Sequence, residues 1–156
     1  MTLAAHVAVG AVIGLATKNP VLGFFAGFVS HFVLDAIPHS DLGSFGGDAG
    51  NFKKIKSWGL VIFGDIILSA ALFFLIFYKT NFLPAVFWGA FGGALPDFID
   101  NNPLWSLSLR KVFPTNYFHA FHETIHFTIS KKKYFWMGIA TQVVVIMVSL
   151  SYILII

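Results

Sequence analysis

Histidine and aspartate recur at a fixed spacing near the end of an apolar stretch. The segment GFVSHFVLDAIPHSD, residues 27–41, places His31, Asp35 and His39 four residues apart and ends in Asp41. Residues four apart lie on the same side of a helix. Imidazole nitrogens and carboxylate oxygens are ligands for zinc and related divalent ions, and the chain has no cysteine to supply a thiolate. The spacing therefore predicts a metal site built from histidine and carboxylate.

Further acids occur in two other apolar runs. LPDFID carries Asp97 and Asp100, Asp65 lies in the run before it, and His6 lies in the first run. An acid at the centre of a membrane helix costs about 2.5–3.5 kcal/mol on insertion scales. The apolar runs contain no internal Lys or Arg to compensate it. These residues therefore favour a shared cation, with His6, Asp97 and Asp100 as further ligands.

A third group of residues matches a known metal-binding pattern. His122, Glu123 and His126 spell HETIH, and His119 precedes them by three residues. On a helix, HExxH presents two imidazoles to one ion, and the glutamate acts as general base. We predict His119, His122 and His126 as ligands, and Glu123 or Asp65 as the base or as a residue that orients a ligand.

The composition indicates an integral membrane protein. Of the 156 residues, 57% are hydrophobic and only 11% are charged, and the mean hydropathy is +0.80. Five apolar runs approach the roughly 17–25 residues that span a bilayer. They are Leu3 to Thr17, Val21 to Ile37, Trp58 to Tyr78, Phe82 to Ile99 and Tyr134 to Ile156. We predict an all-α polytopic bundle of about five transmembrane helices.

The connections divide this single domain, residues 1–156, into parts. Short turns at 18–20 and 79–81 predict two antiparallel hairpins, a first repeat over 1–50 and a second over 58–110, in which Asp35 corresponds to Asp97. The last part, 117–156, contains a His-rich helix and the final span. Residues 117–130 are too short and polar to cross easily, so we expect an interfacial or re-entrant helix there.

This topology places the ionisable residues on one side of the membrane. Most basic residues flank the same side, including Lys53, Lys54, Lys56, Arg110 and Lys111. The positive-inside rule then predicts that the site faces the cytoplasm of a prokaryotic-type inner (plasma) membrane. No basic and aromatic pattern suggests a nucleic acid partner. The expected partners are the lipid bilayer and a lipid substrate.

These motifs resemble the YdjM-like, LexA-regulated, inner-membrane family of metal-dependent hydrolases. The resemblance rests on His6, on GFVSHFVLD, on LPDFID and on the region from His119 to His126. The motif order differs from the family pattern, and the histidine pair lacks the Arg-Gly of that pattern. The resemblance implies a membrane hydrolase that uses a divalent metal.

Together the residues and the resemblance favour a hydrolase that acts on a lipid or lipid-linked ester or phosphoester. It would use one or two divalent ions, and zinc is the expected metal. One alternative is an intramembrane zinc metalloprotease that uses HETIH, with Asp35 or Asp97 as third ligand. A divalent-cation transporter or sensor is a second alternative, although transport sites usually lie near the bilayer midplane. A hydrogen-bonded polar scaffold is a third.

Overall fold

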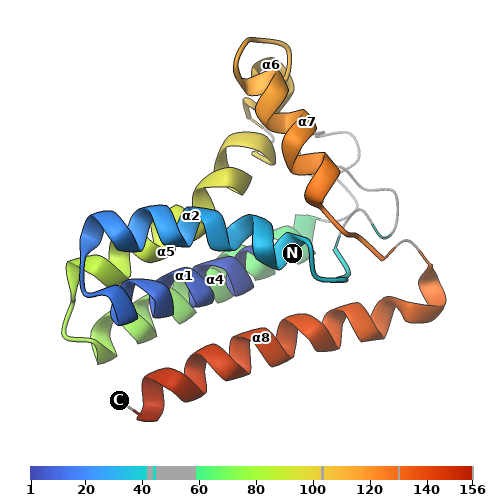
Figure 1. The fold of residues 1–156 in the computed structure, drawn as a ribbon. Helices are drawn as coiled ribbons and strands as arrows, with labels where there is room; N and C mark the ends of the chain where they lie inside the picture. The colour runs from blue at the N-terminus through green and yellow to red at the C-terminus, as the bar shows by residue number, and fades with distance from the viewer. Residues whose placement is uncertain (42–43, 45–58, 103, 130, 156) are drawn as a thin grey trace.

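A computed structural model of the chain describes residues 1–41, 44, 59–102, 104–129 and 131–155. Within these ranges the chain forms seven α-helices, one short 3-10 helix and no strand (Figure 1). The helices are α1 (Leu3–Thr17), α2 (Pro20–Asp35), α4 (Gly59–Lys79), α5 (Pro84–Asp100), α6 (Ser106–Leu109), α7 (Thr115–Ile125) and α8 (Phe135–Ile155), with the 3-10 helix η2 (Lys132–Tyr134) before α8. The predicted all-α class is therefore confirmed.

The five long helices coincide with the five apolar runs to within two residues at each end. Local signals set some of these ends. Asn19 caps α2, since its side-chain oxygen accepts from the backbone N–H groups of Val21 and Leu22 at 3.0 and 3.1 Å. Pro20 occupies the first turn, where its missing N–H has no cost. Lys18 ends α1 in the left-handed conformation, with φ of 52°.

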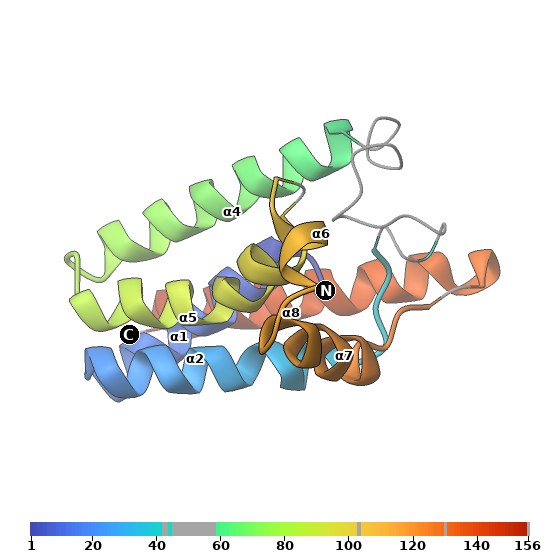
Figure 2. The same ribbon diagram turned by 90° about the horizontal axis from the view of Figure 1, so that it is seen from above.

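Glycines bring α1, α2 and α5 into close contact. A Cβ atom on Gly89 of α5 would lie 2.2 Å from the carbonyl oxygen of Gly10 on α1. One on Gly27 of α2 would lie 2.3 Å from the carbonyl oxygen of Gly89. No residue larger than glycine fits at these contacts without a backbone shift. The three helices lie side by side in both views (Figures 1 and 2) and carry most of the site residues to the same end of the bundle.

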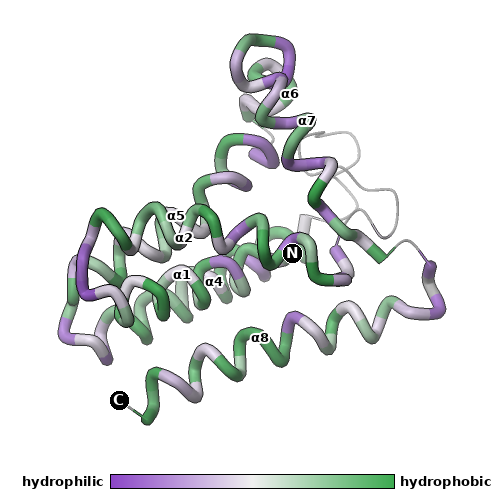
Figure 3. The backbone as a smooth tube through the Cα atoms, in the orientation of Figure 1, coloured by the Kyte–Doolittle hydropathy of each residue, from purple (hydrophilic) through white to green (hydrophobic). Residues whose placement is uncertain are grey.

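Helices α4 and α8 lie outside this three-helix layer and are long and apolar enough to cross a membrane. In Figure 2, α4 lies along one edge of the layer, and in Figure 1 α8 passes below it. Both expose large apolar side chains, such as Leu60 at 88% and Ile155 at 85%. Figure 3 shows hydrophobic colouring along most of these two helices. Among the described residues, no other helix passes the same test of length and composition.

The two ends of the bundle differ. The turns that join α1 to α2 and α4 to α5 lie at one end, and α6 and α7 project at the other, where α7 is steeply inclined to the long helices (Figure 1). Helix α7 therefore overlaps residues 117–130, the segment for which a short interfacial or re-entrant helix was predicted, and it precedes η2. The predicted flanking residues Lys53, Lys54 and Lys56 lie outside the described residues, as does Trp58 at the start of the third apolar run.

Candidate metal centre

The carboxylate of Asp35, the last residue of α2, lies at the centre of the polar cluster and is fully buried. Its Oδ2 atom is 3.0 Å from Nε2 of His31 and 3.1 Å from Nε2 of His122. Its Oδ1 atom is 3.2 Å from Nε2 of His6. Because these histidines belong to α2, α7 and α1, one carboxylate joins residues that are far apart in the sequence.

Hydrogen bonds on the far side of the rings orient two of these histidines. Nδ1 of His31 is 2.8 Å from the carbonyl oxygen of Gly93, which can only accept, so Nδ1 carries the proton. Nδ1 of His122 is 3.1 Å from Oδ2 of Asp100. The Nε2 atoms of His31 and His122 therefore face each other at 3.1 Å beside Asp35. Metal-binding histidines are commonly held by this kind of outer hydrogen bond.

His6 is buried without hydrogen bonds. Among the residues that the structure describes, neither ring nitrogen has a well-aligned hydrogen-bond partner, although Nε2 lies 3.2 Å from Oδ1 of Asp35. Its ring stacks on His31 with centroids 3.9 Å apart. The Asp97 carboxylate completes this side, with one oxygen 3.9 Å from Nε2 of His6 and the other 3.9 Å from Nε2 of His31. A buried imidazole without an aligned partner is costly, so His6 is a candidate ligand for an ion at this position.

His39, His126 and Asp41 lie on another side of Asp35. The Nε2 atoms of His39 and His126 are 3.2 and 3.4 Å from Oδ2 of Asp41, and 4.0 and 3.7 Å from Oδ1 of Asp35. Burial and the nearby α-amino group of Met1 lower the pKa of His126 to about 4. Burial raises the pKa of Asp41, but its hydrogen bond with His39 and nearby positive charges outweigh this and lower it to about 2. Near neutral pH His126 is therefore neutral and Asp41 is ionised.

Two positive charges reach the cluster from outside the helices. Nε of Arg110 is 3.0 Å from Oδ1 of Asp100, and the α-amino group of Met1 contacts Oδ1 of Asp35. Burial lowers the pKa of His122, but its hydrogen bonds with Asp100 and Asp35 outweigh burial and raise the pKa to about 9. The acids are thus partly compensated by groups that the apolar runs do not contain.

The HETIH residues do not all meet at one point. His122 approaches Oδ2 of Asp35, whereas His126 caps the C-terminus of α7 and lies nearer Oδ1. Glu123 is exposed and belongs instead to a group with Asp100 and His119 whose ligand atoms lie within 4.8 Å of one another. His119 is 28% exposed, and its Nδ1 is 2.9 Å from Oδ2 of Asp100.

Asp65, predicted as base or orienting residue, contacts the first turn of α1. Its two oxygens accept hydrogen bonds from the backbone N–H groups of Leu3 and Ala4 at 2.8 and 3.1 Å. These donors lack partners within their own helix, and the helix dipole also stabilises a carboxylate at this end. Asp65 therefore holds the turn that precedes His6.

Two residues outside the predicted ligand set contribute to the cluster. Asp41 ends the quoted motif, two residues beyond His39, but its proximity to His126 depends on how residues 126–129 fold back. Gln142 is buried in α8 and bonds to the backbone on both sides of the cluster. An amide within an otherwise apolar span was the available signal for Gln142.

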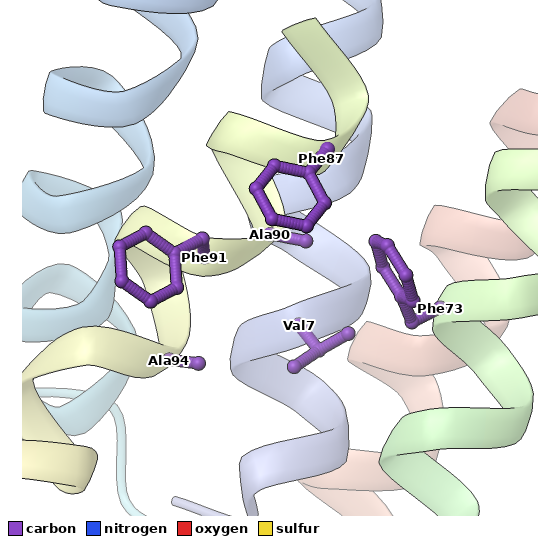
Figure 4. A pocket seen from close by; sticks show the side chains of 6 residues that line it. All are labelled: Val7, Phe73, Phe87, Ala90, Phe91 and Ala94. Atoms are coloured by element: carbon purple, nitrogen blue, oxygen red, sulfur yellow. The ribbon is translucent and has the colours of Figure 1, made fainter. Parts of the chain in front are cut away.

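Two hollows are found among the helices of the described part of the chain. A pocket of about 200 Å³ between α1, α4 and α5 is lined only by apolar side chains, among them Val7, Phe73 and Phe87 (Figure 4). A groove of about 550 Å³ runs between α2 and α7, and Phe28, Phe32 and Phe121 are among its lining residues. The Phe32 ring also contacts His31 and His122, with centroids 5.3 and 5.8 Å apart. The groove is therefore the hollow that adjoins the polar cluster.

No family model matches the chain, and neither the curated proteins nor the solved structures searched contain a match. The His and Asp groups could hold a metal ion, and this conclusion rests on their geometry alone.

Proposed function

We propose that the protein is a membrane-embedded metal-dependent hydrolase that acts on a lipid or lipid-linked ester or phosphoester. The observation that carries the proposal is the convergence of Nε2 of His31, Nε2 of His122 and Oδ2 of Asp35, with separations of 3.0–3.1 Å. Ligand atoms about 2.0 Å from a tetrahedral zinc ion lie about 3.3 Å apart, which is close to these separations.

The proton positions support a cation at this point. Because Nδ1 of His31 donates to Gly93, Nε2 is the ring nitrogen that can present a lone pair to an ion. His122 is held in the same way by Asp100. Two lone pairs and a carboxylate oxygen repel one another unless a proton or a metal ion lies between them. His6 and Asp97 would complete the coordination, and the His6 ring would gain the partner that it lacks.

The ligand set of imidazole and carboxylate suits zinc, and also manganese or iron. A divalent ion here would supply Lewis-acid activation of water and of the substrate oxygen. The chain's own residues would hold and orient that ion. Glu123, which follows His122 in the sequence, is the proposed base. Asp65 acts as a positioning residue for His6 through the first turn of α1.

The membrane arrangement is part of the same proposal. All five long helices would span the bilayer as two hairpins and a final helix, and α7 would lie at the interface, consistent with its steep inclination (Figure 1). The exposed apolar surfaces of α4 and α8 support this arrangement. The site would face the cytoplasm of a prokaryotic-type inner membrane, as the positive-inside rule suggests.

Two observations support a lipid substrate. The apolar groove between α2 and α7 adjoins the cluster through Phe32 and could take an acyl chain. The site lies at the end of the bundle, where a headgroup ester would be found if these helices span. Membership of the YdjM-like family, suggested by His31, Asp35, Asp97 and the HETIH region, is proposed on the same residues.

Metal content measured by plasma mass spectrometry is the first test. The detergent-purified wild type should retain at least one equivalent of zinc, manganese or iron, and both Asp35→Ala and Asp97→Ala should lose it. Thr124→Ala is the matched control, because its hydroxyl bonds only to its own helix, at the Ala120 carbonyl. A folded wild type that holds no metal and takes up no added Zn²⁺ would contradict the proposal.

Hydrolysis is then tested in vesicles that contain ester or phosphoester lipids. Metal-loaded wild type should release product, and His31→Ala should not.

A metalloprotease remains the second candidate, because HETIH lies on and just beyond helix α7. Glu123→Gln should abolish proteolysis of a peptide substrate while the metal stays bound. Full proteolytic activity in that variant would remove the HETIH mechanism. Zn²⁺ uptake by proteoliposomes would instead favour a transporter.

A further inference from the structure

We propose that the centre is binuclear, with a second metal subsite formed by His39, His126, Asp41 and the Oδ1 atom of Asp35. Asp35 would then bridge the two ions. This inference rests on the proposed function, and it adds Asp41 as a ligand and Gln142 as a positioning residue.

The two histidines of this subsite are oriented as metal ligands. Nδ1 of His39 is 2.8 Å from the carbonyl oxygen of Ile37, so Nδ1 donates and Nε2 faces Asp41. Nδ1 of His126 is 2.9 Å from the Thr128 hydroxyl, which itself donates to Asp41. That hydroxyl therefore accepts the proton of His126 Nδ1. Each Nε2 therefore faces the carboxylates, where a bound ion would replace its present contacts with Asp41 and with the Met1 amine.

The subsite shares only Asp35 with the first one. His31 and His122 approach Oδ2 of Asp35, whereas His39 and His126 lie nearer its Oδ1 atom. His6 also approaches Oδ1, from the side of the first subsite. Asp35, His39 and His126 each offer a ligand atom, and these three atoms lie within 4.8 Å of one another. A carboxylate with imidazoles beside both of its oxygens is suited to bridge two ions.

The pocket already attracts positive charge. The α-amino group of Met1 contacts Oδ1 of Asp35 and is 3.4 Å from Nε2 of His126. A divalent ion would compete with this amine for the same oxygen, and its higher charge favours it beside the two carboxylates of Asp35 and Asp41.

Backbone hydrogen bonds hold the two ligand segments together. The N–H of Phe127 donates to the Asp35 carbonyl at 2.8 Å, and the N–H of Ile129 donates to the His39 carbonyl at 2.8 Å. This isolated bridge pairs His39 with Thr128. It holds the His126 ring against the His39 ring, with centroids 4.7 Å apart, although the two residues differ by 87 in sequence number. Both of these backbone bonds join residues outside α1 and α5.

Gln142 completes this frame from α8. Its Nε2 donates to the carbonyl of Ser40 at 2.6 Å, and its Oε1 accepts from the N–H of Thr2 at 2.7 Å. Ser40 lies between His39 and Asp41, and its hydroxyl donates to the Phe135 carbonyl at 2.8 Å. Gln142 is 3% exposed, so loss of its amide would leave buried backbone groups without partners and free the ligand loop.

The test measures metal stoichiometry in the full chain. The purified protein is stripped with a chelator and reloaded with Zn²⁺ for plasma mass spectrometry, or with Mn²⁺ for electron paramagnetic resonance. Wild type should hold two equivalents and show the spin coupling of Mn²⁺ ions about 3.5–4 Å apart. Asp41→Asn and Gln142→Leu should hold one equivalent and lose the coupling.

Ser149→Ala is the control for Gln142→Leu, because Ser149 is a buried polar residue of the same helix that bonds to its own Val145 carbonyl. It should keep both ions. If Gln142→Leu fails to fold, Asp41→Asn alone tests the second subsite. Asp41 follows helix α2 on a loop, and its side chain is 18% exposed. One equivalent in wild type that Asp41→Asn leaves unchanged would overturn the second subsite but not the hydrolase proposal. No bound metal in wild type would overturn both.

Discussion

At the scale of single residues, the hydrogen bonds behind the ligands matter as much as the ligands. Asp100 contacts Nδ1 of His122 and also Arg110 and His119. It thereby fixes the direction in which Nε2 of His122 points. Loss of such an outer partner typically weakens metal affinity 10–100-fold.

We therefore expect Asp100→Asn to weaken Zn²⁺ binding about 10–100-fold, measured by competition with a chelating dye. The stoichiometry should stay unchanged, because the atoms that contact the ion in the proposed first subsite remain. Thr124→Ala, on the same helix as His122, should bind as wild type does. Unchanged affinity in Asp100→Asn would contradict this orienting role of the Asp100 carboxylate.

His122 also predicts how binding depends on pH. Its pKa is raised from 6.5 to about 9, so the metal-free protein carries a proton that zinc must displace. Affinity should therefore rise about tenfold per pH unit from pH 7 and level off near pH 9. Calorimetry in buffers of different ionisation enthalpy should detect about one released proton at pH 7. A flat pH profile without proton release would contradict this role.

The raised pKa of His122 also makes the stability of the metal-free fold depend on pH. Because the folded-state pKa lies above the unfolded value, protonated His122 stabilises the metal-free fold fully below about pH 6.5, and this contribution is lost as the pH rises through 9.

At the scale of helices, the glycine contacts bring the ligands of α1, α2 and α5 together. We expect Gly89→Ala to lower the thermal midpoint, at a cost of about 1–3 kcal/mol, because its Cβ would lie 2.2 Å from the Gly10 carbonyl oxygen. Gly64→Ala is the matched control, since nothing lies within 4 Å of a Cβ there. Equal midpoints for the two variants would exclude this tight contact.

The helices themselves were readily predicted from the sequence. The apolar runs locate α1, α2, α4, α5 and α8, and four-residue spacing places His31 and Asp35 on one helical face. The sequence could not show that Asp65 contacts the first turn of α1, or that the His126 ring lies against the His39 ring. Those contacts depend on tertiary packing and on backbone hydrogen bonds between segments distant in sequence, which no local periodicity encodes.

Asp97 and Asp100 illustrate the same limit. Both were predicted as ligands from one short motif, yet Asp97 approaches His6 and His31 while Asp100 contacts Arg110, His119 and His122. Three residues along a helix rotate a side chain by most of one turn, and the packing of α7 decides what each one meets. Their roles in metal binding remain predictions.

At the scale of the whole molecule, the two hairpin turns lie at the end opposite α6 and α7 (Figure 1). If the long helices span, residues at these ends lie on opposite sides of the membrane. The chain has no cysteine, so single cysteines can report this directly. Lys18→Cys and Lys79→Cys should react with an impermeant maleimide in intact cells, and Lys111→Cys only after permeabilisation. Labelling of all three from one side would contradict the five-span arrangement.

The use of one carboxylate by histidines from both halves of the chain has a consequence for biosynthesis. His6, His31 and Asp35 leave the ribosome long before His122 and His126 are made. A nascent chain that ends before α7 therefore cannot hold an ion as the finished protein would. Metal capture would be among the last events of assembly, so chains truncated before α7 should emerge from cells without metal.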